Sequence, residues 1–353
     1  MKPKPKRKNG TPTPDLAVLG EIVERFSSIR VVLFGDFVCD EFQYGEIARV
    51  SREAPVLILR HRETHLAPGG GANAANNLSV LGARVAAVTV VGEDASGDAL
   101  IQYFRQHRID VSGIVRAKGW LTPTKTRFLA GWTHTTAQQV LRVDREPGGP
   151  PPEATLKKAF GKLKAKLRSA DALAISDYGF GITSPKSVRS ALGSMKKELP
   201  VTLDARFGLN SYARVGITSA TPNEAELEAL HHTAIGRNTE ELKRCALTTL
   251  EEMKLEALLV TRGRDGMALF ERDGERLTEI PVHGSDQAVD VTGAGDTVLA
   301  AYTLALASGA SYLEAAHLAN IAGGLVVMKR GTATVTRQEL LEAIRQEISG
   351  AAS

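Results

Sequence analysis

The chain has 353 residues, of which 24% are charged and 43% are hydrophobic, and its formal net charge is +4. This composition indicates a globular protein, and the length fits one large α/β domain or two smaller ones. No apolar run reaches the roughly 20 residues that span a bilayer, and the first residues lack the apolar core of a signal peptide. The two cysteines, Cys39 and Cys245, lie far apart without neighbouring ligand pairs, which argues against a disulfide framework or a zinc site. We therefore expect a cytoplasmic protein without a membrane span.

The positive charge is concentrated at the start of the chain. The first ten residues contain five basic residues and no acidic one, and subtracting these five charges from +4 leaves −1 for the remainder. We expect residues 1–14, which are rich in Pro and Lys, to form a disordered basic tail. Because the rest of the chain is nearly neutral, we expect no nucleic-acid partner.

The first structural elements predicted are an amphipathic helix from residue 15 to about 26 and a strand at residues 30–34. The strand is a continuous apolar run followed by Gly35 and Asp36. Such a run is typical of a buried parallel strand that delivers a polar residue to its carboxyl end, where open α/β sheets bind ligands. Asp36 and Asp40 are therefore candidates to bind sugar hydroxyls. The alternative is that one of them closes a turn.

Short alternating stretches at residues 41–62 and 125–145 predict antiparallel strands outside the main sheet. Together they would form a small β-sheet lid over the strand ends, which would exclude water from a reactive phosphoryl group. Arg142 belongs to this region and is a candidate to bind the acceptor substrate. An exposed lid face would also suit dimerisation, so we expect a homodimer through the lid strands.

Three glycines at positions 69–71 precede a predicted helix of small residues that runs to Gly82. Gly69 and Gly70 would let the backbone approach a ligand or a strand closely. Asn73 and Asn77 lie one helical turn apart on one face, and a bound polyol would supply the hydrogen-bond partners that buried amides need. The alternative is a helix packed tightly on the sheet.

After a Pro-rich loop at residues 147–152, strand and helix patterns alternate. Each of four apolar strands ends in a polar residue, at Asp177, Asp204, Asn223 and Thr261. The repetition predicts a doubly wound, mainly parallel sheet in which these four residues share one edge.

The segment from Asp290 to Asp296 is a turn of small residues that runs directly into an apolar helix. The first amides of such a helix lack intrahelical partners, and the helix dipole favours negative charge there. We interpret Gly293, Ala294 and Gly295 as an anion hole and Asp296 as a proton acceptor for an attacking hydroxyl. The alternative is an ordinary helix cap, because Asp is a favoured capping residue.

Other phosphate-binding devices are absent from the sequence, including the G-x-x-x-x-G-K-[ST] loop and a G-x-G-x-x-G after the first strand. If the protein uses ATP, the anion site must therefore be the turn before Asp296. The loop 261–266 offers further donors for phosphate oxygens, although a plain hairpin turn explains it equally well. Asn223 and Glu226 share one side of a helix start and would hold Mg²⁺ through water, with a capping interaction as the alternative.

Three of these segments resemble the motifs of the ribokinase-like (PfkB) carbohydrate kinases. Residues 69–92 are similar to the N-terminal pattern of this family, and residues 290–303 are similar to its C-terminal pattern, D-[PSTV]-x-G-A-G-D followed by small residues. The Asn223 to Glu226 segment resembles its N-x-x-E magnesium motif. The resemblance covers about residues 28–345, and it implies one kinase domain over residues 15–347 that uses ATP and Mg²⁺.

The resemblance also implies roles for individual residues. For catalysis and the acceptor sugar it implies a base at Asp296, an anion hole at Gly293, Ala294 and Gly295, and sugar contacts at Asp36, Gly69, Gly70 and Asn73. For the nucleotide and ions it implies Asn223 and Glu226 at the metal and phosphates, Thr261, Gly263 and Gly266 at the nucleotide phosphates, Asn320 at adenosine, and a monovalent-cation (K⁺) loop near Asp290, Thr292 and Gly331.

Within this family the segments 49–56, 176–178 and 331–335 are similar to the heptose 7-phosphate kinases. This similarity implies transfer of the ATP γ-phosphate to the anomeric hydroxyl of D-glycero-β-D-manno-heptose 7-phosphate, on the way to the lipopolysaccharide core. Phe180 stands where those kinases usually carry Lys, and residues 131–137 resemble an extension of the lid hairpin. Phe180 favours the alternative of a kinase for an unphosphorylated sugar or nucleoside; a third hypothesis is a non-catalytic sugar- or nucleotide-binding regulator.

Overall fold

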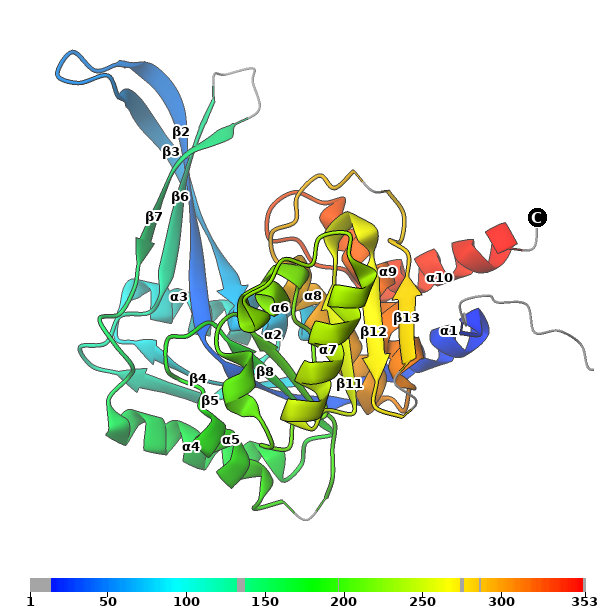
Figure 1. The fold of residues 1–353 in the computed structure, drawn as a ribbon. Helices are drawn as coiled ribbons and strands as arrows, with labels where there is room; N and C mark the ends of the chain where they lie inside the picture. Colours follow the sequence, from blue (N-terminus) through cyan, green and yellow to red (C-terminus); the bar gives the residue numbers. More distant parts are fainter. Residues whose placement is uncertain (1–13, 132–136, 196, 274–275, 286, 352–353) are drawn as a thin grey trace, which may run out of the picture.

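The computed structural model describes residues 14–131, 137–195, 197–273, 276–285 and 287–351 (Figure 1). The predicted tail, apart from Pro14, and most of the predicted lid extension at 131–137 lie outside these ranges. None of the helices within them combines the length and the apolar character that crossing a bilayer requires.

The main sheet has nine strands, and its architecture confirms the predicted doubly wound, mainly parallel arrangement. Neighbouring strands are parallel from β5 to β11, whereas the last two strands at the other edge run antiparallel to their neighbours. In spatial order the strands are β13 (Arg276–Ile280), β12 (Met267–Glu271), β11 (Ala257–Thr261), β10 (Ser219–Ala220), β9 (Val201–Ala205), β8 (Ala172–Asp177), β1 (Arg30–Gly35), β4 (Arg84–Gly92) and β5 (Asp110–Ala117).

Helices cover both faces of this sheet, and each face has its own hydrophobic core. The alternation of side chains along β1 divides the strand between the cores: Val31 and Leu33 pack into one, Val32 and Phe34 into the other. The first core is closed by α1 (Leu16–Arg25), α2 (Gly71–Val80), α3 (Ala95–Gln106), α8 (Ala294–Ala307), α9 (Tyr312–Val327) and α10 (Arg337–Ala351). The second is closed by α4 (Glu153–Leu167), α5 (Pro185–Leu192), α6 (Glu224–His231) and α7 (Thr239–Met253).

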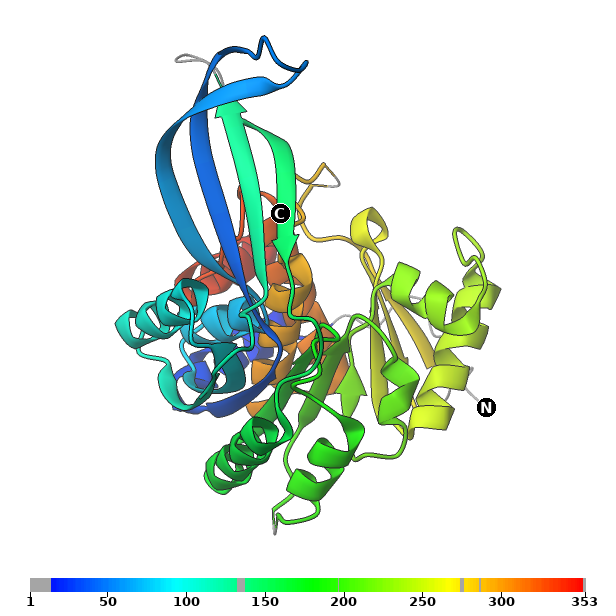
Figure 2. The same ribbon diagram turned by 90° about the vertical axis from the view of Figure 1, so that its left-hand side faces the viewer.

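A second sheet of four strands projects from the carboxyl edge of the main sheet (Figure 2). Its order is β3 (Leu57–Gly70), β2 (Phe37–Val50), β6 (Thr124–Gly131) and β7 (Gln138–Arg145), so the predicted lid strands exist and are longer than expected at 37–70. The prediction of a purely antiparallel lid is wrong, because β2 and β6 pair in parallel. Both strands leave the same edge of the main sheet, β2 directly after β1 and β6 shortly after β5, and they therefore run outward together.

Helix α8 brings the predicted catalytic turn to the foot of this lid. All of its residues from Asp296 to Leu306 are buried, and it packs between α2, α9 and the main sheet. A helix that is apolar on every side is stable only in such an interior position. Its first turn lies at the carboxyl edge of the parallel strands, where open α/β sheets bind ligands.

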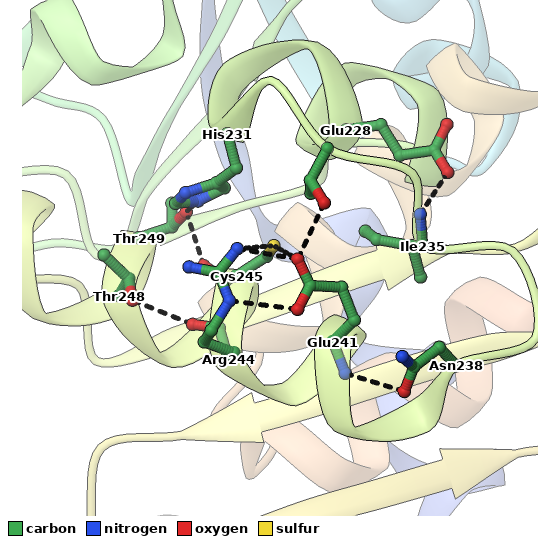
Figure 3. A network of polar contacts seen from close by, with 10 residues as sticks. Glu228, His231, Ile235, Asn238, Glu241, Arg244, Cys245, Thr248 and Thr249 are labelled. Atoms are coloured by element: carbon green, nitrogen blue, oxygen red, sulfur yellow. Dashed lines mark hydrogen bonds and ion pairs between the residues drawn. The ribbon is translucent and has the colours of Figure 1, made fainter.

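The pair α6 and α7 is tied together by polar contacts (Figure 3). His231 of α6 lies 2.7 Å from the hydroxyl of Thr249 on α7, and Glu241 accepts two hydrogen bonds from Arg244. Both cysteines are buried and free, as the sequence suggested, and Cys245 lies within this network. The contacts fix α6, whose first residues face the site described next.

Candidate active site

Asp296 is only 3% exposed and receives hydrogen bonds from two other elements. Its Oδ2 accepts from Asn73 Nδ2 of α2 at 2.8 Å, and its Oδ1 accepts from the hydroxyl of Tyr178, just after β8, at 3.2 Å. Burial raises the pKa of Asp296 to about 7, and the two hydrogen bonds act in the opposite direction. The capping alternative fails, because Gly293 is the N-cap residue and the cap has no side-chain hydrogen bond. Asp296 therefore has the burial and the pKa that suit a proton acceptor near neutral pH.

The turn before Asp296 requires glycine at one position and is open at another. Gly293 has a φ of +77°, and a Cβ there would lie 2.5 Å from Asn73 Nδ2, whereas a Cβ on Gly295 would meet nothing within 4 Å. The amide of Ala294 donates to the carbonyl of Val291, which removes it from the predicted anion hole. Within the described residues the amides of Gly295 and Asp296 donate to no acceptor, so the available anion site is narrower than predicted.

Asp40 and Asp36, both predicted to bind sugar hydroxyls, lie in different surroundings. Asp40 pairs with Arg127 at 2.5 Å, and a Cβ on Gly69 would lie 2.5 Å from its carboxylate. Asp36 is fully buried, and its two oxygens accept hydrogen bonds from three backbone amides of the loop 178–182. The carboxylate of Asp36 is thus occupied by a loop distant in sequence. This favours an anchoring role over the predicted sugar contact and differs from a local turn.

The amide pair on α2 also differs from its prediction. Asn77 is fully buried, donates to Asn73, and accepts a hydrogen bond from the hydroxyl of Thr297 at 3.0 Å. Asn73 uses its own amide on Asp296. The protein itself therefore supplies the partners that were expected from a polyol, and Asn77 links α2 to α8.

A cavity of about 530 Å³ lies beside Tyr178, between the lid and the ends of β8 and β9. Three cations line it, and they differ in their partners. Arg142 is held by both oxygens of Asp144, at 2.7 and 2.6 Å. Lys125 lies 5.5 Å from the ring centre of Tyr178, Arg206 lies 5.4 Å from that of Phe207, and neither has an ion pair among the described residues. Burial lowers the pKa of Lys125. The predicted contact Arg142 is thus already paired, while Lys125 and Arg206 form no ion pair within the described part of the chain. The carboxylates of Asp40 and Asp144 are close enough to Lys125 to raise its pKa, against the larger effect of burial.

A second cavity, of about 390 Å³, opens on the other side of the α8 turn. It brings together the four residues predicted for the nucleotide with the exposed part of the turn; the lining includes Thr261, Gly263, Gly266, Asn320, Ala294 and Gly295. Apolar side chains complete it, among them Met267, Val282 and Val298, and such a lining suits a purine ring. Gly266 has a φ of +78°, and a Cβ there would lie 2.1 Å from the Ile280 carbonyl.

The fold also places the members of each predicted ion site in contact with one another. Asn223 and Glu226 form a reciprocal capping box at the start of α6, with hydrogen bonds of 2.8 and 2.9 Å, which is the alternative to a metal site. At the predicted monovalent-cation loop, Asp290 accepts hydrogen bonds from the amides of Thr292 and Gly331, at 2.9 Å each.

The side chain of Asp204, near the end of β9, makes no hydrogen bond within the described part of the chain. Burial raises its pKa well above the ordinary value, and the nearby carboxylates of Glu226, Asp296 and Asp177 raise it further. Repulsion between such groups is relieved by a cation, and carboxylate oxygens are ligands that Mg²⁺ prefers. A cation such as Mg²⁺ near Asp204 would relieve this repulsion. Within the described residues, however, no group of three or more His, Cys, Asp or Glu side chains is placed to hold a metal, and Glu226 Oε2 already accepts a hydrogen bond from the Asn223 amide.

Three residues of the site were not predicted for it: Tyr178, Asp204 and Arg206. Asp204 was placed on the correct sheet edge, and its position after an apolar strand was the available signal. Lys125 and Arg206 lie in segments 81 residues apart, and only the fold brings them to one cavity.

Known proteins share the sequence pattern and the fold of this chain. The profile of the pfkB family carbohydrate kinases matches residues 30–339. The bifunctional protein HldE of Geobacter sulfurreducens is 38% identical over 322 residues, which cover 90% of this chain and 63% of that protein. The bifunctional protein HldE of Paramagnetospirillum magneticum is 37% identical over 341 residues, or 94% of this chain and 67% of that protein. The chain therefore spans about two thirds of the length of these relatives.

Solved structures show the same fold at lower identity. Phosphofructokinase-2 from Escherichia coli, in complex with substrates and products, has a TM-score of 0.71 and 18% identity over 90% of this chain and 99% of its own. Ribokinase from Arabidopsis thaliana, complexed with ribose and ATP, has a TM-score of 0.67 and 20% identity over 90% of this chain and 98% of its own. With the family profile covering most of the sequence, the chain belongs to the pfkB family of carbohydrate kinases and is a phosphotransferase that acts on a sugar.

Proposed function

We propose that this kinase transfers the γ-phosphate of ATP to a sugar that already carries a phosphate, with D-glycero-β-D-manno-heptose 7-phosphate as the preferred acceptor. The observation that carries the proposal is a pair of cations, Lys125 and Arg206, that line the cavity beside Tyr178 and form no ion pair within the described residues. A phosphate dianion would form ion pairs with both side chains. The similarity to the bifunctional HldE proteins and the lid segment 49–56 support a heptose as the sugar.

The proposed reaction needs a proton acceptor on the acceptor side and anion stabilisation on the donor side. Asp296 would take the proton of the anomeric hydroxyl while that oxygen forms a bond to the γ-phosphorus and the bond to the β-phosphate oxygen breaks. The amides of Gly295 and Asp296 would stabilise the phosphoryl group in transit. Magnesium held near Asp204 and Glu226 would neutralise charge on the phosphates. ATP would occupy the cavity that contains Thr261 and Asn320.

One observation favours the second candidate, a kinase of an unphosphorylated sugar or nucleoside. Phe180 and Phe207 line the acceptor cavity and give it an apolar wall. An acceptor without a phosphate could pack on these rings, but it would give Lys125 and Arg206 no ion-pair partner. For this reason the phosphorylated acceptor is the better fit.

The test is a panel of acceptors assayed for ADP release with ATP and Mg²⁺. The panel pairs sugars with their phosphates: fructose with fructose 6-phosphate, ribose with ribose 5-phosphate, and the heptose with its 7-phosphate. We expect saturation only by phosphorylated acceptors, and the highest kcat/KM with the heptose 7-phosphate. Saturation by ribose or fructose, but by no sugar phosphate, would establish the second candidate instead.

We also propose that two copies associate through the lid strands. Leu66, Leu141 and Val143 are 43%, 55% and 43% exposed. The strand register places them on the face turned away from Asp40 and Lys125, on either side of Thr126 and Phe128. The same face also carries Glu41, Gln43 and Arg145, so it is mixed in character, and its exposed apolar side chains would be covered when two lids pack together. Light scattering after size exclusion should give the mass of a dimer, and Leu141→Lys should lower it; a wild-type monomer at micromolar concentration would exclude the proposal.

A further inference from the structure

Asp36 joins β1 to two other parts of the site without lining either cavity. Its Oδ2 accepts hydrogen bonds from the amides of Tyr178 and Phe180, both at 2.9 Å, and its Oδ1 accepts from the amide of Ile182 at 3.2 Å. These amides belong to a loop 142 to 146 residues away in sequence. A buried carboxylate that accepts several amides is a rigid anchor for the backbone that supplies them.

The backbone of Asp36 holds a second segment. Its carbonyl accepts a hydrogen bond from the amide of Gly71, the first residue of α2, at 3.0 Å. A Cβ on Gly71 would lie 3.0 Å from that carbonyl oxygen, and a Cβ on Gly70 would lie 3.2 Å from the Tyr178 ring. The loop, the start of α2 and Asp36 are therefore packed with little freedom to shift.

The two segments that Asp36 holds are those that supply the hydrogen-bond donors of Asp296. The loop supplies the Tyr178 hydroxyl, and α2 supplies the Asn73 amide two residues after Gly71. We propose that Asp36 is a positioning residue, which fixes both donors of Asp296 and makes no contact with the sugar. This inference rests on the proposed role of Asp296 as proton acceptor.

The asparagine variant tests this role because it keeps the shape of the side chain. In Asp36→Asn an NH₂ group replaces one carboxylate oxygen and meets a backbone N–H, so at least one anchor of the loop is lost. The Tyr178 hydroxyl would then move off Asp296. Because that hydrogen bond lowers the pKa of Asp296, its loss should raise this pKa. Asp40 and Lys125 also shift the pKa of Asp296, and Asp296 in turn shifts the pKa of Asp204. The variant leaves these three residues in place.

The kinetic experiment compares Asp36→Asn, Tyr178→Phe and the double variant in full-length protein. We expect kcat to fall by roughly 10- to 100-fold in each single variant, with the KM of the sugar changed by less than about twofold. The double variant should lose little more than either single one, because both changes remove the same hydrogen bond. A raised KM for the sugar with a normal kcat in Asp36→Asn would show that Asp36 binds the sugar. Fully additive losses of kcat in the double variant would show that Asp36 and Tyr178 act independently. Either result overturns the proposal.

Two further readouts need no acceptor. Hydrogen exchange of residues 178–182 should become faster in Asp36→Asn, and ¹³C NMR should show a raised pKa of Asp296 in both single variants. Unchanged exchange and an unchanged pKa would refute the proposal even if no sugar phosphate is a substrate, so its failure is distinct from that of the proposed acceptor.

The matched control is Asp94→Asn. Asp94 also accepts hydrogen bonds from backbone amides, those of Gly97 and Thr122, but it lines neither cavity. This variant should leave the kinetics, the hydrogen exchange of residues 178–182 and the pKa of Asp296 unchanged.

Discussion

Replacing Asp296 by asparagine should stabilise the folded protein at neutral and alkaline pH while it abolishes most of the turnover. Asparagine has the shape of the aspartate, and its oxygen can still accept from Asn73 while its NH₂ group donates to the Tyr178 oxygen. The variant therefore removes a buried negative charge without opening a cavity. We expect kcat to fall by roughly 10²-fold or more, because the proton acceptor is gone.

The size of the stabilisation follows from the pKa. The carboxyl shifts from 3.8 to about 7 on folding, and at 1.36 kcal/mol for each of roughly three pH units the charged form destabilises the folded state by about 4 kcal/mol. Because the folded-state pKa is raised, the stability that the protonated group contributes is complete below pH 3.8 and is lost as the pH rises to 7. The variant has no such loss, so the excess of its free energy of unfolding over that of the wild type should be small near pH 4 and largest above pH 7.

Urea unfolding followed by circular dichroism, at pH 4.5, 6 and 8, measures this difference. The free energy of unfolding of Asp296→Asn should exceed that of the wild type at pH 8, and the gap should shrink towards pH 4.5. A variant that is equally or less stable than the wild type at pH 8 would refute the reasoning, because the buried carboxylate would then carry no penalty. Full turnover in the variant would show that Asp296 is not the proton acceptor.

Three further outcomes follow from the site. Gly293→Ala should lose ~1–3 kcal/mol of stability, because its φ is positive and its Cβ would meet Asn73, whereas Gly295→Ala should leave urea unfolding unchanged. Arg206→Gln should raise the KM of a sugar phosphate by about tenfold or more and leave the KM of ATP unchanged in steady-state kinetics. Asp204→Asn should raise the Mg²⁺ concentration for half-maximal activity by roughly tenfold, measured by Mg²⁺ titration at saturating ATP.

Each of these has an outcome that counts against it. Equal stabilities of the two glycine variants would mean that the turn tolerates a side chain at both positions. An unchanged KM for the sugar phosphate in Arg206→Gln would show that its phosphate does not bind in the cavity beside Tyr178. The same Mg²⁺ dependence in Asp204→Asn and the wild type would place the metal elsewhere.

The sequence was sufficient for the features that depend on local pattern. Apolar runs ending in polar residues predict the parallel sheet and its ligand edge, and the turn before Asp296 is recognisable because glycines precede a uniformly apolar helix. The residues predicted for the nucleotide, from Thr261 to Asn320, came from the family resemblance, and the structure gathers them in one cavity.

Features that depend on pairing between distant segments were beyond such reasoning. The position of Asp36 after a strand fits a sugar ligand and a loop anchor equally well, and only the packing of residues 178–182 decides between them. The parallel pairing of β2 and β6 depends on where both strands leave the main sheet. Likewise, an Asn and a Glu three residues apart suit a metal site or a capping box. The structure shows the box, and the Glu226 carboxylate in it is the one proposed to lie near magnesium.

The central claim is that the kinase adds a second phosphate to a phosphorylated sugar, and ³¹P NMR of the product tests it most directly. With D-glycero-β-D-manno-heptose 7-phosphate, ATP and Mg²⁺, we predict a new anomeric phosphate resonance that grows in step with ADP while the 7-phosphate signal persists. ADP that forms with inorganic phosphate alone, or a new phosphate on a hydroxyl other than the anomeric one, would contradict it.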